Sequence, residues 1–376
     1  MHVNKKYLEL WNTKLPSLEE FTALSWNLRL KILALLGHLA PSSHNTQPWK
    51  FYCDEKTQTI SVVLDRHLVL LESDPTGRQA VISIGCAIEN IVRAGEVCGL
   101  ESTIKYFRVT GEQVTPLLDE VADDALVTLA EISFNKGRVN DHQADILKVM
   151  QKRMTMRAEF DPDKEIPPSI LRQLTLDASK FGVTLHVVED KTTKLTLSEF
   201  QAQADGYALN SPLFARELGE WLLPNETENM LGMPGNTFGL DDIQAKRIHE
   251  GLVGKIPLEP EDMLRFALGG KVGFEKSPAV LFITAPHDDI SGWIATGRAM
   301  ERIFLTLEGS NISYAVHAGI VEVRLVKRIF ASTLGIADSL TTVFRIGYLK
   351  DEQVKMERPH SPRQPMEAIL LNEKPC

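Results

Sequence analysis

A segment with helical character occurs twice in this chain of 376 residues. Residues 84–91 resemble residues 296–303 without a gap, and Gly85 returns as Gly297, an offset of 212 positions. The same offset carries Gly85, Ala87, Glu89, Ile91 and Glu96 onto Gly297, Ala299, Glu301, Ile303 and Glu308. Glycine and alanine in both copies favour close contact between helices. The repeat therefore restricts the fold to two related halves.

The surroundings of the repeated helix recur in the same order. An apolar stretch rich in Val and Ile lies upstream in each half, and a second lies downstream, as expected for strands. A helix followed by a strand also opens each half. In the first half the opening helix and strand are 28–38 and 49–53, the upstream strand is 60–64 and the downstream strand is 127–132. In the second half the corresponding segments are 170–180 and 183–188, then 279–283, then 342–347.

We therefore predict an α+β fold of two fused modules with mixed, largely antiparallel sheets flanked by helices. The first module covers residues 20–137, residues 138–144 form a linker, and the second module covers residues 145–371. Two copies are too few for a solenoid, so the chain is expected to be an intramolecular pseudo-dimer. Such a chain has less need of a partner, and we expect a monomer. The alternative is two unrelated domains with similar amphipathic helices.

The second half carries an insertion at residues 191–277. It contains a helix-like segment at 195–207, apolar Trp221, Leu222, Leu223 and Met230, and a Gly/Pro/Asn-rich run at 231–239. Insertions of this length are commonly functional. The sequence allows either a lid or wall over a substrate, or an arm used in dimer contacts.

Composition excludes some classes of function. A net charge of −9 argues against nucleic-acid and membrane-surface partners, which favour a basic face. The four cysteines show no metal or disulfide spacing, which indicates reduced thiols. We predict no metal site. No signal-like segment or run of about 20 apolar residues is present, so we expect a cytoplasmic protein.

Two further segments suggest a ligand. The first is the Pro-bounded run APSSHNTQPW at residues 40–49, which supplies amides, hydroxyls and backbone groups. The second is RMTMR at residues 153–157. Arg153 and Arg157 share a face whether the segment is helical or extended, and guanidinium groups bind phosphate as a planar fork. Together the segments suit a planar heterocycle that carries a phosphate, such as flavin mononucleotide (FMN).

Each residue type also has a structural explanation. Asn45 and Gln47 offer amides for the mixed edge of a flavin ring, or they satisfy backbone atoms of the turn. His44 is an acid/base group or a loop anchor, and we favour the anchor. Trp49 is expected in the core. For Arg153 and Arg157 the alternative is a solvated basic helix start.

These segments resemble the FMN-dependent nitroreductase superfamily, and in particular its Acg-like branch of two-in-one chains. The resemblance covers nearly all of residues 25–371, and the run at 40–49 is its most specific motif. DPTGR at 74–78 and SPRQP at 361–365 also resemble the branch. The loop motif occurs only in the first half and the arginine motif only ahead of the second, which implies one complete flavin site and one lost site per chain.

The resemblance implies roles for individual residues. It implies FMN as cofactor and NAD(P)H as a transient reductant. No separate dinucleotide fingerprint is present, as the resemblance leads us to expect, because NAD(P)H would share the open flavin face with the substrate. No acid or base is demanded, so no catalytic residue is named, and Arg78 is expected to pair with a neighbouring side chain. The residues expected to bind the cofactor are Pro41, Ser42, Ser43, His44, Asn45, Gln47, Arg153, Thr155, Arg157, Gly319 and Arg363.

The expected function is NAD(P)H-dependent reduction of nitro compounds or quinone-like small-molecule acceptors by flavin hydride transfer. A non-catalytic protein that sequesters FMN under a lid is the first alternative. A dehydrogenase that uses the same flavin in the oxidative direction is the second.

Overall fold

The computed structural model describes residues 9–117, 124–138, 145–257 and 269–375. Most of the predicted linker 138–144, and Cys376, lie outside the described residues. The chain forms two compact units, which we describe separately. The loop unit draws on residues 5–153, 289–305 and 362–376, and the insertion unit on residues 154–288 and 306–361.

The loop unit is built on a four-stranded sheet in the order β1-β2-β4-β3, with every neighbouring pair antiparallel. Trp49 lies opposite Leu64, and Ile60 lies opposite Ile132. The Val, Ile and Leu residues of β2 and β4 suit a pleated, buried surface. The strands are β1 (Trp49–Asp54), β2 (Thr59–Asp65), β3 (Leu100–Tyr106) and β4 (Leu126–Lys136).

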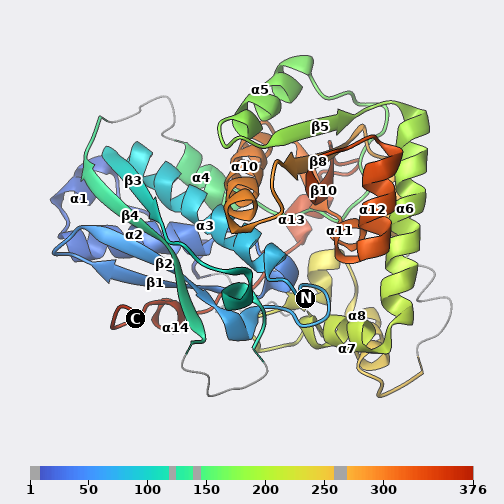
Figure 1. Cartoon of the computed structure of the whole chain (residues 1–376), viewed down its shortest axis with the longest axis horizontal. Coiled ribbons are helices and arrows are strands. Elements are labelled where there is room, and N and C mark those ends of the chain that lie inside the picture. Colours follow the sequence, from blue (N-terminus) through green and yellow to red (C-terminus); the bar gives the residue numbers. More distant parts are fainter. Residues whose placement is uncertain (1–8, 118–123, 139–144, 258–268, 376) are drawn as a thin grey trace. The chain divides into compact units, whose positions relative to one another are not determined.

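Helices α2 and α3 pack against this sheet (Figure 1). Helix α3 is buried almost throughout, as expected of a central helix, and its buried residues include the charged Glu89. The helices of this unit are α1 (Leu18–Ala23), α2 (Trp26–His38), α3 (Arg78–Val97), α4 (Ile146–Lys152) and α14 (Met366–Ile369), with the greater part of α10 (Ile290–Gly309). Short 3₁₀ turns occupy η2 (Ser43–Asn45), η3 (Arg66–Leu68) and η4 (Gly111–Val114).

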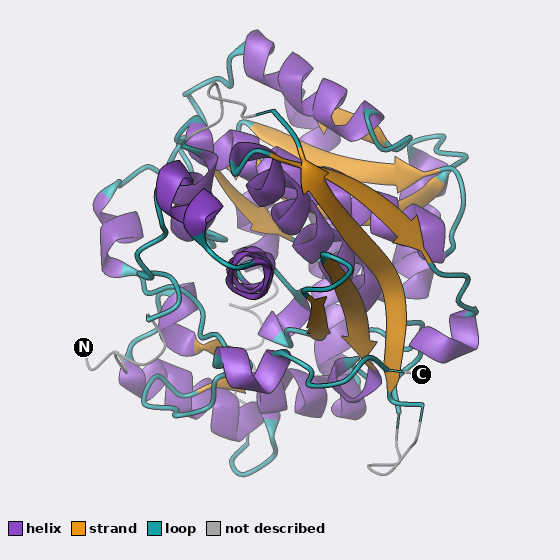
Figure 2. Cartoon of the chain, turned by 90° about the vertical axis from the view of Figure 1, so that its left-hand side faces the viewer, coloured by secondary structure: helices purple, strands orange, loops and turns teal. Residues whose placement is uncertain are grey.

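The insertion unit has its own four-stranded antiparallel sheet, in the order β5-β8-β10-β9. Figure 2 shows the helices in purple and the strands in orange. The strands are β5 (Thr184–Val188), β8 (Ala279–Ala285), β9 (Ser313–Val316) and β10 (Ser339–Gly347). The helices are α5 (Pro168–Ser179), α6 (Lys191–Asn210), α7 (Pro212–Trp221), α8 (Asp242–Leu252), α11 (Gly319–Glu322), α12 (Arg324–Thr333) and α13 (Gln353–Glu357), with short β6 (Leu222–Leu223), β7 (Met233–Pro234) and η6 (Gly235–Phe238).

The two sheets have the same topology. In each sheet the strand that opens the half lies at the edge (β1 or β5), next to the strand upstream of the repeated helix (β2 or β8). The strand downstream (β4 or β10) comes next and pairs with the strand that directly follows the repeated helix (β3 or β9). The connection after that helix also repeats, because Gly99 and Asn311, again 212 positions apart, both adopt left-handed backbone with φ of 73° and 54°. The predicted α+β fold of two related modules is confirmed.

The boundaries of the two compact units differ from those of the predicted modules. Residues 289–305 and 362–376 belong with the first sheet, although the module predicted at 145–371 contains nearly all of them. The cause is visible in α3 and α10. A Cβ atom on Gly297 would lie 2.0 Å from the carbonyl oxygen of Ile82, and one on Gly85 would lie 2.5 Å from that of Ile294. The repeated glycines therefore allow the two helices to touch, as their sequence predicts. The module boundaries themselves stay a prediction.

The described part of the insertion is mostly helical, and its first helix, α6, belongs to a core. Leu197 and Ala204 of α6 are fully buried in a cluster with Phe282, Phe330 and Val343. A second apolar cluster joins the end of α6 to the later elements of the insertion, through Leu209, Leu218, Leu222, Met233 and Leu252. The use of the insertion as a lid stays a prediction.

Within the described residues, no helix combines the length and apolarity that a membrane crossing needs. Cys53, Cys86 and Cys98 are free thiols, and the last two are buried. Burial raises the pKa of Cys53 to about 12 and that of Cys98 to about 11, which keeps both thiols protonated and unreactive.

Candidate functional site

The loop between α2 and β1 has an unusual backbone. His44, Asn45 and Gln47 have φ of 47°, 56° and 52°, so three of four consecutive residues are left-handed without being glycine. Each such residue costs about 1–2 kcal/mol relative to ordinary backbone. Strain of this kind persists only where the surroundings enforce it, and it concentrates at functional sites. The corresponding connection after α5 has only four residues, 180–183, so the loop exists in one copy alone.

The second half of the loop is buried and fully engaged by protein. Gln47 is 0% exposed, its Nε2 donates to the carbonyl of Asn45, and its Oε1 accepts from the backbone N–H of Gln364 at 2.9 Å. Asn45 donates from Nδ2 to the carbonyl of Pro362 at 3.0 Å. Both amides therefore bind backbone atoms of the protein, which is the structural alternative given above for them. Their contact with a cofactor stays a prediction.

Arg363 holds this half of the loop in place. Its Nη1 donates to Oδ1 of Asn45 at 2.7 Å and to the carbonyl of Pro362 at 2.9 Å. Its Nε donates to the carbonyl of His38, and its Nη2 donates to those of Leu39 and Ala40. A guanidinium has five N–H donors, and all five are used within the protein. The side chain is 4% exposed.

His38 and Trp49 brace the two ends of the loop. Trp49 donates from Nε1 to Nδ1 of His38 at 2.8 Å, so His38 must carry its proton on Nε2, which lies 2.9 Å from the carbonyl of Gln364. Burial and the charge of Arg363 lower the pKa of His38 to about 3. The imidazole is therefore neutral. Trp49 lies in the core, as predicted, with 0% exposure.

The first half of the loop keeps solvent-accessible surface. Pro41, Ser42, Ser43 and His44 are all partly exposed. Ser42 accepts from the backbone N–H of Gln47 at 2.9 Å, so its Oγ stabilises the left-handed turn. Ser43 donates from Oγ to Oε1 of Gln79 in the first turn of α3. These four residues are the part of the loop that a ligand can reach.

The motif DPTGR at 74–78 builds the helix start on which this half of the loop rests. Gly77 turns the chain with φ of 72°. A Cβ there would lie 2.0 Å from the carbonyl oxygen of Val114, so only glycine fits. Asp74 then accepts from the backbone N–H groups of Gln79 and Ala80, which satisfies donors that a helix start leaves free.

Arg153 also reaches the loop. It follows the end of α4 in extended conformation, with φ of −54° and ψ of 129°, and its Nη2 donates to the carbonyl of Leu39 at 2.6 Å. Arg153 and Arg363 thus share one acceptor, and both guanidiniums lie over the ring of Trp11, at 6.0 and 4.6 Å. Of the predicted site residues, the structure brings together the whole loop, Arg153 and Arg363.

The counter-charge of Arg153 is Glu301, one of the repeated glutamates. Nε of Arg153 lies 3.4 Å from Oε1 of Glu301, which is 0% exposed. Burial raises the pKa of Glu301 to about 7, although Arg153 and Asn90 act in the opposite direction. The carboxyl therefore titrates near neutral pH and couples the charge of this pair to pH.

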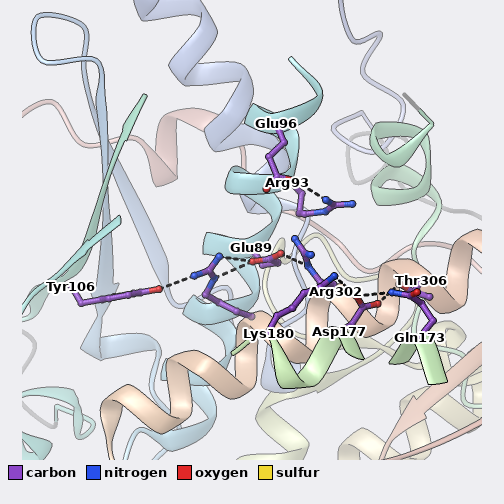
Figure 3. A network of polar contacts seen from close by, with 10 residues as sticks. Glu89, Arg93, Glu96, Tyr106, Gln173, Asp177, Lys180, Arg302 and Thr306 are labelled. Carbon is purple, nitrogen blue, oxygen red and sulfur yellow. Dashed lines mark hydrogen bonds and ion pairs between the residues drawn. The ribbon is translucent and has the colours of Figure 1, made fainter. Parts of the chain in front are cut away.

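The other repeated glutamate, Glu89, has a different environment (Figure 3). It is also 0% exposed, and it accepts from Arg298 at 2.8 and 3.0 Å and from Arg302 at 2.8 Å. The positions equivalent to these arginines in α3, at the offset of 212, are Cys86 and Asn90. Helix α3, the first copy, therefore lacks the arginine pair, and Arg153 pairs with Glu301 instead.

The remaining predicted residues lie in the insertion unit. Thr155 pairs as an isolated bridge with Tyr314, which extends the edge at β9. The guanidinium of Arg157 lies 4.3 Å from the ring centre of Phe238 in the insertion. Gly319 begins α11. The segment 153–157 is extended, which excludes the solvated helix start. The roles of these three residues toward a cofactor stay predictions.

Gly319 has a neighbour that the sequence did not indicate. A Cβ on Gly319 would lie 3.0 Å from Oδ1 of Asp205 in α6. Gln201, one turn earlier, donates to the same oxygen at 2.7 Å. Burial raises the pKa of Asp205 to about 7. Asp205 and Gln201 lie in the insertion, where no motif pointed to them.

Other residues were missed for different reasons. Glu301 stood out in the repeat and Gln364 in the motif SPRQP, but only their contacts show what they hold. Trp11 and His38 carried no sequence signal at all. Within the described residues, no group of three or more His, Cys, Asp or Glu side chains is placed to hold a metal ion.

Comparison with known proteins gives a consistent result. No family model matches the chain. An uncharacterized protein of Mycobacterium tuberculosis is 24% identical over 281 residues, which cover 73% of this chain and 74% of that protein. A second protein of M. tuberculosis, named "Putative NAD(P)H nitroreductase acg", is 20% identical over 350 residues, which cover 91% of this chain and 95% of its own length.

Among solved structures, the FMN-dependent nitroreductase NfnB from Mycobacterium smegmatis, in complex with NADPH, matches 62% of this chain and 100% of its own at 16% identity. The TM-score of this match is 0.39. The similarity to the acg protein extends over nearly the whole chain. The resemblance to the FMN-dependent nitroreductase superfamily, and to its Acg-like branch, is confirmed.

Proposed function

We propose that this protein binds FMN and uses NAD(P)H to reduce a small-molecule acceptor, a nitro compound or a quinone. The observation that carries the proposal is the loop at residues 40–49. Its left-handed backbone is costly, and Arg363, Gln47 and His38 hold it in that conformation. Residues 41–44 of the same loop keep accessible surface. The similarity to the acg protein of M. tuberculosis supports the same reading.

The residue types in the accessible first half of the loop suit FMN. Ser42 and Ser43 bring hydroxyls and His44 brings an imidazole, which suit ribityl and phosphate oxygens. Asn45 and Gln47 would act by fixing the loop, because their amides are engaged inside the protein.

When bound, FMN supplies the hydride-transfer chemistry, while the protein binds and orients it. Arg153 would contribute positive charge, which stabilises negative charge that develops on a nearby ring. The pairing of Arg153 with Glu301 sets how much of that charge is available, because the carboxyl titrates near pH 7. Protonation of Glu301 would remove the negative charge that offsets Arg153, so a ligand would meet a larger net positive charge.

The first test is the visible spectrum of the purified protein and its flavin-to-chain ratio. We expect a flavin spectrum after reconstitution with FMN and one FMN per chain, because the loop exists in one copy only. A chain that takes up no FMN would contradict the proposal. A ratio of two would contradict the single site.

The second test separates turnover from storage. Anaerobic mixing of the FMN-loaded protein with NADPH should bleach the yellow absorbance, and a nitro compound or quinone should restore it. Persistent colour would favour the alternative, a protein that sequesters FMN. Parallel mixing with NADH shows which reductant is used.

A further inference from the structure

Three arginines gather in the insertion unit around residues 157–160. Arg358 donates from Nη1 to the carbonyl of Arg157 at 2.9 Å. Arg345 donates from Nη2 to the next carbonyl, that of Ala158, also at 2.9 Å. The guanidiniums of Arg345 and Arg358 lie close enough to Arg157 for the three charges to act on one another.

Aromatic rings and a glycine shape this group. Arg157 lies over Phe238 at 4.3 Å, and Arg345 lies over Phe160 at 4.2 Å. Gly239 has φ of 80°, and a Cβ there would lie 2.6 Å from Nη2 of Arg358. The glycine thus lets Arg358 approach the backbone next to Phe238. Arg157 and Arg358 keep partial solvent exposure, so a ligand can reach them.

The group has no counter-charge. Among the residues that the structure describes, no carboxylate lies within ion-pair distance of Arg157, Arg345 or Arg358. Burial and the neighbouring arginines lower the pKa of Arg157 to about 10 and that of Arg345 to about 10. The pKa of His317, which Arg345 contacts at 3.1 Å, falls well below its usual value for the same reasons.

The arginines of the loop unit differ in this respect. Arg153 has Glu301, and Arg363 spends all five donors on oxygen atoms of the protein. Arg345 is likewise engaged, with donors directed to Ala158, His317 and Ser277. Arg157 has no hydrogen bond from its guanidinium within the described residues, and Arg358 has one. Donors and uncompensated charge therefore remain at these two side chains.

Buried like charges without a counter-ion are unfavourable, and a bound anion relieves them. We propose that Arg157 and Arg358, supported by Arg345, bind an oxyanion, a phosphate or carboxylate group of a ligand. Forked guanidiniums recognise both groups through paired hydrogen bonds. The oxyanion belongs either to the flavin phosphate or to an acidic acceptor substrate. The first source rests on the proposed function, and the second names a substrate class for it.

The direct test is a titration of the full chain with inorganic phosphate against chloride at matched ionic strength. Thermal unfolding should shift upward with phosphate, because a ligand that binds the folded state stabilises it. Arg358→Gln and Arg157→Gln should each weaken phosphate binding about tenfold, as expected for a lost charge-assisted contact. Arg358→Lys should be intermediate, since it keeps charge but not the fork.

The matched control is Arg328→Gln, an exposed arginine of α12 in the same unit, which should leave the phosphate response unchanged. An unchanged phosphate response in both Gln variants of Arg157 and Arg358 would overturn the proposal. So would an equal loss in Arg328→Gln, which would indicate a general charge effect.

Two further comparisons identify the source. If Arg358→Gln weakens FMN but not riboflavin, the oxyanion is the flavin phosphate. If it raises KM for 4-nitrobenzoate but not for nitrobenzene, the oxyanion is an acid group of the acceptor. Absence of flavin from the wild-type protein would refute the proposed function and leave the phosphate titration untouched, so the two failures are distinguishable.

Discussion

The guanidinium of Arg363 donates to the side-chain oxygen of Asn45 at 2.7 Å, across 318 positions of sequence. The same side chain binds three consecutive carbonyls, those of His38, Leu39 and Ala40. The segment near the C-terminus therefore decides the conformation of the loop that begins at residue 40. Residues 41–44 of that loop keep partial solvent exposure, so a ligand can reach them.

Arg363→Met should lower the free energy of unfolding by about 2–4 kcal/mol, because it leaves several buried acceptors without donors. It should also release the left-handed backbone of the loop and weaken FMN. Urea unfolding and a flavin titration measure the two effects. Arg324→Met, at an exposed arginine, is the control. Arg363→Lys should rescue little, since one ammonium cannot replace five donors. Full stability of Arg363→Met would contradict this role.

Arg153→Ala should weaken FMN by a few kcal/mol, about the value of a lost charge-assisted contact in a buried setting. Its stability should depend on pH, because the variant leaves Glu301 buried without its cation. The loss should be small at pH 5, where Glu301 is protonated, and larger at pH 8. Unfolding curves at both values test this. Retention of full flavin occupancy would exclude Arg153 from binding.

Glu301→Gln should flatten the pH dependence of stability between pH 4.5 and 8. The folded pKa of about 7 lies above the unfolded value of 4.5, so the wild-type protein loses stability as pH rises through that window. The loss is about 3 kcal/mol for a shift of this size. Denaturant unfolding across the window measures the difference between the two proteins. Parallel curves would show that Glu301 does not titrate there.

His38→Gln should flatten the pH dependence of the free energy of unfolding on the acid side. The pKa of His38 is about 3 in the folded protein against 6.5 unfolded, so its contribution is present above pH 6.5 and lost as pH falls toward 3. The slope is at most about 1.4 kcal/mol per pH unit. Glutamine can still accept from Trp49. Wild-type and variant unfolding between pH 7 and 4 should therefore converge as pH falls, and a constant gap would refute the assignment.

Gly297→Ala should destabilise the protein by about 2–3 kcal/mol, because its Cβ would meet the backbone of α3 at Ile82 and Gly85. Gly206→Ala, in α6, meets nothing within 4 Å and should instead stabilise by about 0.5–1 kcal/mol through helix propensity. Thermal unfolding of the pair gives the comparison. Equal effects of the two substitutions would mean that α3 and α10 are not in close contact in solution.

Local patterns predicted most of the secondary structure. The strands at 60–64 and 279–283 and the helices at 28–38 and 170–180 are found where periodicity and the repeat indicate them, because burial of one face fixes residue types along an element. The loop of residues 40–49 was also singled out, since its composition is specific. The conformation of RMTMR was left open between helix and strand, and only the pairing of Thr155 with Tyr314 decided it.

The sequence by itself determined that the chain is a duplication, that its two sheets match, and that a single copy carries the ligand loop. These follow from spacing and residue type, which a linear pattern records. Tertiary structure alone decided that Arg363 holds the loop and that Glu301 faces Arg153. It also decided that Arg157 and Arg358 lie together with no acid beside them among the described residues. Such partners are hundreds of positions apart or carry no motif, and charge pairing depends on distance in space, which sequence order does not encode.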